Sequence, residues 1–336
     1  MTGSAVVIRT ESVVCPLCQT SEWDPVFAGE DRFSGVPGIF QVVECQRCGH
    51  LYTNPCPTRE SLSSCYPEEY QVHQSALTAI QQKSAETTDR RSWLSYVPGV
   101  RAFYRFLRND RGQIVPLPPS SERSCALEVG CSAGDFLQKL RSAGWQAQGV
   151  ELVHGPAEAA RQRGFEVFEG VFEEAPLEKE KFDHIFAWMV LEHTVDPVAV
   201  LTKMRGLLRP GGKIYFSVPN CQVWDRYLFG KEWQCWDLPR HLQHFHPATL
   251  KLALRKSGLE SIRIIPQASV YTLLGSIGLA LSRSGNDWCR KCGQKFLSWN
   301  YGAPPLAVWA ILAVIMQFTS RTVGSSRITV IASKPA

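Results

Sequence analysis

From residue 125 onward, short apolar runs alternate with longer stretches in which apolar residues recur every three or four positions. The short runs predict strands, and the longer stretches predict helices that bury one face. The expected strands cover residues 125–129, 146–151, 165–168, 183–188, 212–218, 260–266 and 327–333. The expected helices between them cover residues 134–143, 155–163, 197–208 and 247–257. This alternation predicts an α/β fold with a doubly wound, seven-stranded, mainly parallel sheet.

The segments outside this pattern have a different character. Residues 1–70 hold two Cys-x-x-Cys pairs and many turn-forming residues, which is typical of a small module organised by a metal ion. The stretch 76–108 becomes amphipathic and predicts a helix ahead of a Pro- and Ser-rich boundary. We therefore expect five parts: a zinc-binding module (1–70), a helical linker (71–120), the core (121–268), an apolar helical insertion (269–325) and a final core strand (326–336).

The insertion contains two apolar runs, at residues 269–281 and 305–318. They are 13 and 14 residues long, which is short of the roughly 20 residues that a helix needs to cross a bilayer. Basic residues lie between them and suit an acidic lipid surface: Arg283, Arg290, Lys291 and Lys295. Two interpretations stay open, namely peripheral membrane contact through residues 269–320, or packing on the core as a lid or a dimer surface.

The composition is that of an ordinary globular protein, with 44% hydrophobic and 20% charged residues among 336. The N-terminus lacks a basic segment followed by an apolar run, so we expect no secretory signal. A cytoplasmic location follows, either free or peripheral to the inner face of the membrane. The net charge of +5 comes without a dense Lys/Arg stripe, which argues against nucleic acid as the partner. Oligomeric state is not indicated.

The segment 126–140 combines a short apolar strand, a loop of small residues and a helix. Small residues let a ligand approach the backbone, and doubly wound sheets bind ligands beyond the carboxyl ends of their strands. A dinucleotide fingerprint needs glycine at positions 130, 132 and 135, but the chain has Gly130, Ser132 and Asp135. Asp135 would stand at the helix N-terminus, where a pyrophosphate binds, and two anions cannot share that dipole. The loop therefore argues against NAD and tolerates a positively charged cofactor.

Four segments now follow one another in order: LEVGCSAGDFL, GVEL, FDHIFAWMVLEHTVDP and LLRPGGKIYFSVPN. This set resembles the class I S-adenosylmethionine (SAM)-dependent methyltransferases, of the type 11 and type 23 groups, over residues 125–220 and again over 238–258. The resemblance implies a Rossmann-like methyltransferase fold with SAM as cofactor. Ser132 stands where the family most often has glycine, and Glu151 matches its ribose-binding acid. The implied cofactor-binding residues are Glu128, Gly130, Ser132, Gly134, Glu151, Ala187, Trp188 and Met189.

The first two Cys-x-x-Cys pairs are Cys15 with Cys18 and Cys45 with Cys48. Four thiolates can close a tetrahedron around Zn²⁺ and leave no open position, so we expect a structural zinc ion. The alternatives are free thiols or a redox pair. The pairs also resemble the N-terminal module of some sugar and natural-product methyltransferases. A third pair, at positions 289 and 292, has no obvious partner pair, so a second metal site and unpaired thiols both stay open.

Aromatic, Arg and His residues are dense after the fifth expected strand. We expect four of them to bind the acceptor: Trp224, Tyr227, Trp236 and Arg240. His193, His241 and His244 are candidates for a general base, because imidazole titrates near neutral pH. For each of them the alternative is a packing or helix-capping role, which is the more common role of a histidine before a helix, and we assign His246 to the start of a helix. The segment around 240–245 resembles a PRHL-x-x-F sequence found in bacterial methyltransferases of this broad group.

The sequence thus predicts a SAM-dependent methyltransferase that acts on a small-molecule, sugar or lipid-linked acceptor, at oxygen. Two alternatives remain, an RNA methyltransferase and a non-catalytic protein that keeps the fold for binding. The intact Gly130, Gly134 and Glu151 argue against the second.

Overall fold

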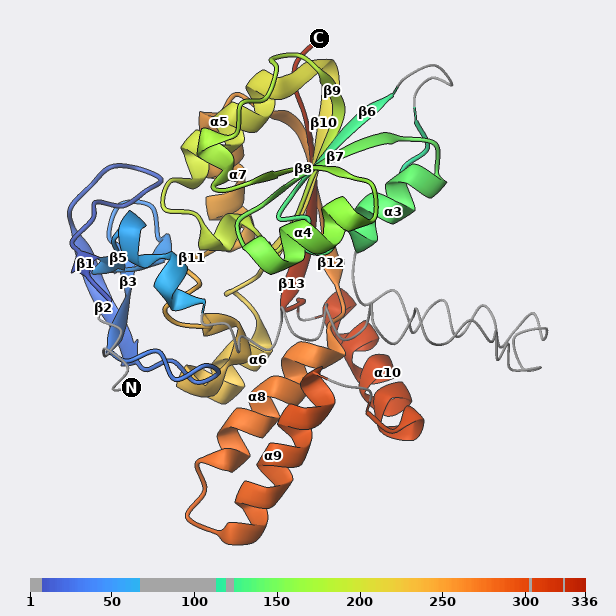
Figure 1. The fold of residues 1–336 in the computed structure, drawn as a ribbon. Coiled ribbons are helices and arrows are strands. Elements are labelled where there is room, and N and C mark those ends of the chain that lie inside the picture. Colours follow the sequence, from blue (N-terminus) through green and yellow to red (C-terminus); the bar gives the residue numbers. More distant parts are fainter. Residues whose placement is uncertain (1–7, 67–112, 119–123, 302–303, 323) are drawn as a thin grey trace, which may run out of the picture.

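The computed structural model describes residues 8–66, 113–118, 124–301, 304–322 and 324–336. The linker helix expected over 76–108 lies outside these residues. Figure 1 shows three parts: an α/β core, a small β-rich module at the N-terminal end, and a helical projection below the core.

A seven-stranded sheet forms the centre of the core (Figure 1), in the order β12-β13-β10-β9-β6-β7-β8. Its strands are β6 (Cys125–Val129), β7 (Gln146–Glu151), β8 (Glu166–Glu169), β9 (Phe182–Trp188), β10 (Leu208–Pro219), β12 (Glu260–Gln267) and β13 (Arg327–Ser333). β13 is antiparallel to both of its neighbours, and all other adjacent strands are parallel. The predicted seven-stranded, mainly parallel sheet is confirmed.

Helices cover both faces of this sheet: α3 (Asp135–Ser142), α4 (His154–Gln162), α5 (Pro197–Leu207) and α7 (Pro247–Lys256). Ile185 of β9 packs in the cluster that holds α5 and α7, whereas its neighbour Phe186 packs in the cluster that holds α3. Successive strand side chains point to opposite faces, which is why both residues of this apolar run are buried. As expected, His246 stands directly before α7, where its N–H donates to Thr249 Oγ1 at 3.1 Å.

The fifth strand of the core differs from its expected bounds of 212–218. β10 starts at Leu208, and its register with β9 shifts between Leu208 and Lys213. Gly211, with φ +72°, lies in this irregular stretch. The Pro-Gly-Gly segment is therefore a bulge within a longer strand, because glycine reaches the left-handed region without steric cost.

The N-terminal module holds two small antiparallel sheets, a pair formed by its first and fifth strands and a four-stranded sheet that borrows one strand from the core sequence. Its four-stranded sheet has the order β11-β4-β3-β2. The module strands are β1 (Thr10–Glu11), β2 (Trp23–Gly29), β3 (Phe40–Cys45), β4 (Leu51–Thr53) and β5 (Cys56–Pro57), and the borrowed strand is β11 (Gln243–His244). The sequence did not indicate β11, because two residues are too few to show a strand period. This strand ties the module to the core.

Short helices complete the connections: η1 (Arg59–Ser61), η2 (Ser63–Cys65), η4 (Phe172–Glu174), η5 (Leu191–His193), α6 (Trp224–Phe229), η6 (Gly230–Glu232) and η7 (Gln234–Trp236). The insertion forms α8 (Val270–Ser282), α9 (Asp287–Tyr301) and α10 (Leu306–Thr322), which extend away from the sheet (Figure 1). A Cβ at Gly278 would lie 2.7 Å from Leu297 Cγ, so this glycine permits the close approach of α8 and α9.

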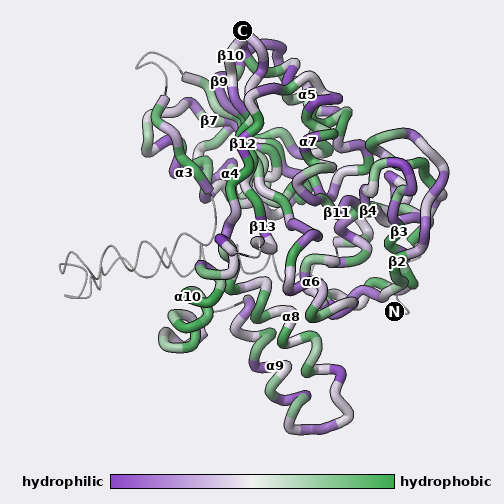
Figure 2. The backbone as a smooth tube through the Cα atoms, turned by 180° about the vertical axis from the view of Figure 1, so that it is seen from behind, coloured by the Kyte–Doolittle hydropathy of each residue, from purple (hydrophilic) through white to green (hydrophobic). Residues whose placement is uncertain are grey.

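The two apolar runs of the insertion have different surroundings. The first becomes α8, most of which is buried, and the second becomes α10. Hydrophobic residues are prominent along α10 in Figure 2. Four of them, spaced at helical intervals, remain exposed: Ile311, Val314, Ile315 and Phe318. Within the described residues, no helix has the length and apolar character needed to span a membrane.

Candidate active site

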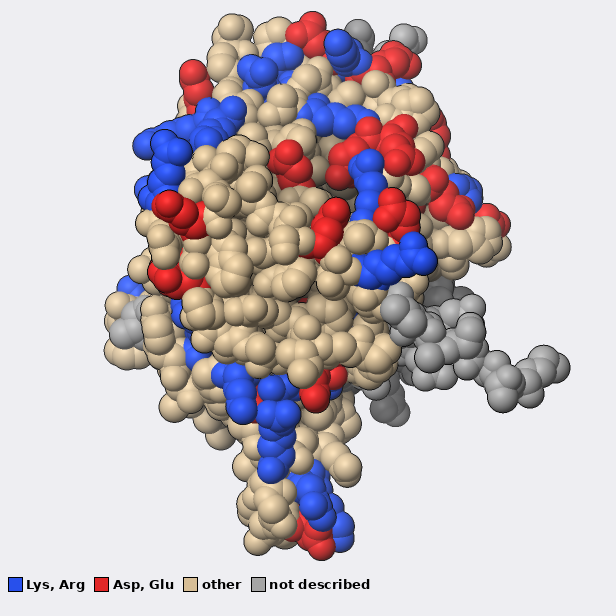
Figure 3. All heavy atoms as spheres, turned by 90° about the vertical axis from the view of Figure 1, so that its left-hand side faces the viewer, with Lys and Arg blue, Asp and Glu red and all other residues tan. Residues whose placement is uncertain are grey.

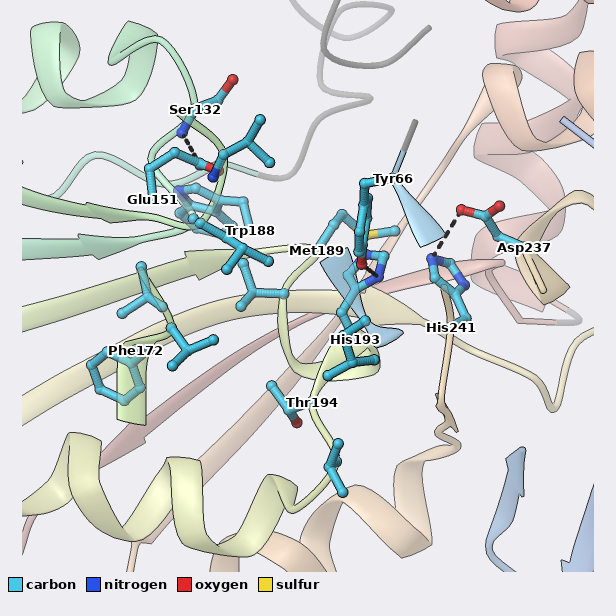
Figure 4. Close-up of a pocket in the computed structure, with 18 of the residues that line it drawn as sticks. Tyr66, Ser132, Glu151, Phe172, Trp188, Met189, His193, Thr194, Asp237 and His241 are labelled. Atoms are coloured by element: carbon cyan, nitrogen blue, oxygen red, sulfur yellow. Dashed lines mark hydrogen bonds and ion pairs between the residues drawn. The ribbon is translucent and has the colours of Figure 1, made fainter. Parts of the chain in front are cut away.

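A cavity of about 850 Å³ opens where β6, β7, β8 and β9 end. Its volume lies in the range of small-molecule sites. The core supplies one wall, helix α8 contributes Tyr271 and Thr272, and the N-terminal module contributes Glu11, Phe33, Arg59, Leu62 and Tyr66. Figure 4 shows the residues after the core strands at one end and a His-rich cluster at the other. The cavity therefore lies between all three parts of the molecule.

Glu151, the last residue of β7, organises the first end of the cavity. The backbone N–H of Ser132 donates to its Oε2 at 2.8 Å, and the N–H of Val153 donates to its Oε1 at 2.9 Å (Figure 4). Burial raises the pKa of Glu151, while these backbone hydrogen bonds act in the opposite direction. Both carboxylate oxygens are thus held in place and keep further acceptor capacity.

The first loop approaches its neighbours too closely for a side chain at Gly130. Its φ is +70°, and a Cβ there would lie 2.6 Å from Val190 Cγ2. Both facts require glycine at this position. The loop backbone consequently lies directly at the cavity wall, beside the segment that follows β9.

Aromatic and apolar residues after β8 and β9 form the next part of the wall. Trp188, the last residue of β9, and Met189, the next residue, both line the cavity. Phe172 of η4 lines it as well (Figure 4). The sequence analysis did not identify Phe172. The sequence could have indicated this residue. Parallel strands end at the same edge of a sheet, so the segment after the third strand, which contains Phe172, must also face the crevice.

Five of the eight residues assigned to cofactor binding line the cavity: Gly130, Ser132, Glu151, Trp188 and Met189. The other three do not. Glu128 and Ala187 are buried within their strands, and Gly134 faces Phe165, whose ring a Cβ would meet at 3.2 Å. Burial, followed by the nearby charge of Glu151, raises the pKa of Glu128 well above its ordinary value. These three residues shape the strand and loop from behind.

Two of the three candidate bases meet at the other end of the cavity. The rings of His193 and His241 lie 4.7 Å apart at 76°. His193 Nδ1 lies 2.9 Å from the Tyr66 hydroxyl and 3.0 Å from the Arg240 carbonyl oxygen, and His241 Nδ1 lies 2.8 Å from the Cys235 carbonyl oxygen. Burial lowers the pKa of His241, and burial together with the charge of His241 lowers the pKa of His193 to about 3. Both imidazoles are therefore neutral at pH 7.

The third candidate, His244, does not line the cavity. It lies in β11, where it packs against Trp236 with ring centroids 4.9 Å apart, and burial lowers its pKa well below the ordinary value. His244 pairs with Leu51 of β4 in the sheet of the module. This position keeps its side chain away from the cavity, unlike the side chains of His193 and His241.

None of the four residues expected to bind the acceptor lines the cavity either. Trp236 packs against Phe27 of the module at 4.7 Å, Trp224 joins hydrophobic clusters beside the module and the insertion, and Tyr227 is exposed on α6. The Arg240 side chain is fully buried. Its guanidinium donates to both oxygens of Asp31, at 2.7 and 2.8 Å, and to Oδ1 of Asp237. The Arg240 side chain therefore links the module to the core and does not face the cavity.

The four thiols of the N-terminal pairs gather at one point, all within 4.8 Å of one another. Cys15 Sγ lies 3.6 Å from Cys48 Sγ, and Cys18 Sγ lies 3.3 Å from Cys45 Sγ. Sulfur atoms around a tetrahedral zinc ion are about 3.8 Å apart, so the arrangement could hold such an ion. Cys289 and Cys292 are one turn apart on α9, and neither joins a group of potential ligands in the described part of the chain.

A family model described as a methyltransferase domain matches residues 91–264. The chain is 32% identical over 148 residues to a ubiquinone biosynthesis O-methyltransferase of Nitrosococcus oceani, covering 40% of this chain and 62% of that protein. It is 29% identical over 166 residues to the protein of that name from Aromatoleum aromaticum, covering 44% and 70% respectively. A malonyl-[acyl-carrier protein] O-methyltransferase of Serratia marcescens is 29% identical over 157 residues, covering 45% and 61%. Two of these three matches span less than two thirds of the relative's length.

Proposed function

This chain belongs to the methyltransferase domain family, and from that premise we propose that it methylates a hydroxyl oxygen of a small organic acceptor with SAM as donor. The observation that carries the proposal is the fixed Glu151 carboxylate at one end of the cavity, beside a loop that requires glycine at position 130. The relatives named as O-methyltransferases support oxygen as the accepting atom.

The residues around the first end of the cavity fit the donor. Glu151 can accept hydrogen bonds from two ribose hydroxyls, because each carboxylate oxygen offers more than one acceptor site. The buried indole N–H of Trp188 has no hydrogen-bond partner in the part of the chain that the structure describes and is available to a ligand in the cavity. Carboxylates in the lining outnumber the two arginines, Arg59 and Arg327, which favours a positively charged ligand; the carboxylates are Glu11, Glu151, Glu173, Asp196 and Asp237. SAM, when bound, supplies a methyl group on such a cationic sulfur.

The acceptor is assigned to the opposite end, against His193, His241 and Tyr66. The acceptor hydroxyl must lose its proton as its oxygen is methylated, and this wall carries the two neutral imidazoles. The Tyr66 hydroxyl positions His193 through their 2.9 Å contact. The cavity of about 850 Å³ suits a small molecule or the head of a sugar-containing or lipid-linked molecule.

We also infer that Cys15, Cys18, Cys45 and Cys48 hold a structural zinc ion. The sulfur separations support this assignment. With four sulfur ligands the ion has no open position, so its role is to stabilise the module.

A peripheral contact with an anionic membrane at the cytoplasmic side is a further part of the proposal. The exposed stripe of α10 is apolar, and Figure 3 shows Lys and Arg side chains gathered on the helical projection. Flotation with anionic liposomes is the test. The variant Ile311→Asp/Phe318→Asp should lose the binding of the unmodified protein, while Tyr227→Asp on α6 should retain it, and equal flotation of all three proteins would refute the contact.

Calorimetric titration with SAM tests the donor site. Glu151→Ala should weaken binding at least about 100-fold, because each hydrogen bond to a charged group contributes about 1.5–3 kcal/mol. Glu169→Ala is the matched control, since Glu169 pairs with Glu151 in register at the end of β8, binds Arg161 and His154, and does not line the cavity. Equal affinity of Glu151→Ala and the unmodified protein would refute the site. Transfer of labelled methyl from SAM to hydroxylated small molecules, with RNA as the competing acceptor, tests the acceptor class.

A further inference from the structure

Glu192 is a buried acid at the His-rich end of the cavity. Its side chain has no exposed surface, and among the described residues neither carboxylate oxygen has a hydrogen-bond partner. A buried carboxylate costs several kcal/mol unless a proton or a cation neutralises it. The carboxylate oxygen and ring nitrogens of His193 and His241 lie within 4.8 Å of one another. The acid and the two imidazoles therefore surround one point.

The hydrogen bonds of the two imidazoles leave the same ring atom free. His241 Nδ1 faces the Cys235 carbonyl oxygen, and His193 Nδ1 faces the Arg240 carbonyl oxygen. A carbonyl oxygen only accepts, so each Nδ1 carries the proton and each Nε2 keeps its lone pair. Histidines that bind a metal through one nitrogen donate the other N–H in this way. The backbone thus holds both rings in the tautomer that a cation needs.

The cluster is closed on one side and open on the other. His193 and His241 line the cavity, whereas Glu192 lies behind them. Asp237 also lines the cavity, with Oδ2 at 3.8 Å from His241 Nε2, and adds an oxygen beside the free nitrogen. Two imidazoles and one carboxylate with open positions are a typical ligand set for first-row divalent transition metals. The four-cysteine group, by contrast, is complete without a further ligand.

We propose that Glu192, His193 and His241 bind a divalent first-row transition metal ion whose open positions face the acceptor end of the cavity. The role of the ion rests on the proposed function. Such an ion would lower the pKa of an acceptor hydroxyl at its open positions, so that the hydroxyl would lose its proton to solvent as its oxygen takes the methyl group from the sulfur of SAM and S-adenosylhomocysteine leaves. In that case His193 and His241 act as ligands and do not take the proton themselves.

Mn²⁺ is the probe, because this hard cation avoids the four-thiolate site. That site is first loaded with one equivalent of Zn²⁺, so that no Zn²⁺ is left to occupy the proposed site. Free Mn²⁺ in a titration of the full-length protein is measured from its six-line EPR signal. We expect one Mn²⁺ per chain, and loss of at least about tenfold in affinity for Glu192→Gln and for His241→Ala. The matched controls Glu180→Gln and His154→Ala change an exposed acid and an exposed histidine and should bind as the unmodified protein does.

Unmodified protein that leaves the EPR signal of free Mn²⁺ undiminished would overturn the proposal, as would full affinity in either ligand variant. Thermal unfolding of each variant shows whether it is folded. If one is not, nitrogen couplings in the pulsed EPR spectrum of the unmodified complex decide, since only coordinated imidazole produces them. Titration of the same samples with SAM distinguishes the metal site from the proposed function. If the protein binds SAM but not Mn²⁺, the metal site is refuted and the proposed function is not.

Discussion

Replacement of Arg240 by methionine should separate its structural role from the acceptor role that the sequence indicated. The guanidinium is fully buried and bridges Asp31 of the module and Asp237 of the core. It also donates to the Cys65 carbonyl oxygen at 3.3 Å. Methionine keeps the length of the side chain but leaves two carboxylates without their cation. Breaking a buried ion pair in this way costs about 3–5 kcal/mol.

Urea denaturation followed by tryptophan fluorescence measures this loss as the change in the free energy of unfolding. Arg209→Met is the control, because Arg209 forms a partly exposed pair with Asp183 and such pairs contribute about 0–1 kcal/mol. The double variant Asp31→Asn/Arg240→Met should lose less than the sum of the single variants, since the second change no longer breaks an intact pair. SAM affinity should stay the same throughout. A free energy of unfolding within about 1 kcal/mol of the unmodified value for Arg240→Met would refute the reasoning.

Burial lowers the pKa of His184 below its ordinary 6.5, so below that pH the unfolded chain binds a proton that the folded chain does not. The free energy of unfolding should therefore fall on acidification below pH 6.5, and His184→Phe should reduce that slope by up to about 1.4 kcal/mol per pH unit; an unchanged slope would contradict this. Gly130→Ala should weaken SAM binding about tenfold or more because φ is +70° there, whereas Gly206→Ala, which meets nothing within 4 Å, should not. Elemental analysis should find one zinc ion fewer per chain in Cys48→Ser than in the unmodified protein, and this variant should unfold at least about 5 °C lower, unlike Cys289→Ser. An unchanged zinc content of Cys48→Ser would exclude the assigned ligand set.

The sequence was most informative where structure follows from local pattern. The apolar runs determined the strands because both faces of a parallel sheet are buried. The loop at Gly130 and the acid at Glu151 could be placed because both follow directly from the ends of strands. Asp135, which argued against a pyrophosphate, forms an ion pair with Arg163 in the structure.

The acceptor end could not be predicted in the same way. Tyr66 reaches His193 across 127 residues of chain, and Asp31 reaches Arg240 across 209. The hydrophobic periodicity of the sequence does not indicate such contacts, because they depend on how the module docks on the core. Dense aromatic and basic residues indicated that the segment after β10 is special, but not that Trp236 and Arg240 face the module. Glu192 did leave a signal, as an acid directly after an apolar run.

These contacts make Arg240 the link between the module and the acceptor end of the cavity. Its guanidinium holds Asp31 of the module and Asp237 of the cavity wall, and its carbonyl oxygen orients His193. The module adds Tyr66 to the same imidazole. By contrast, the hydrogen bonds that fix Glu151 come entirely from core residues. The folded module is therefore needed to build the acceptor end, while the hydrogen bonds that hold Glu151 at the donor end need only the core. This difference gives a physical reason for a cysteine-rich module to accompany this domain.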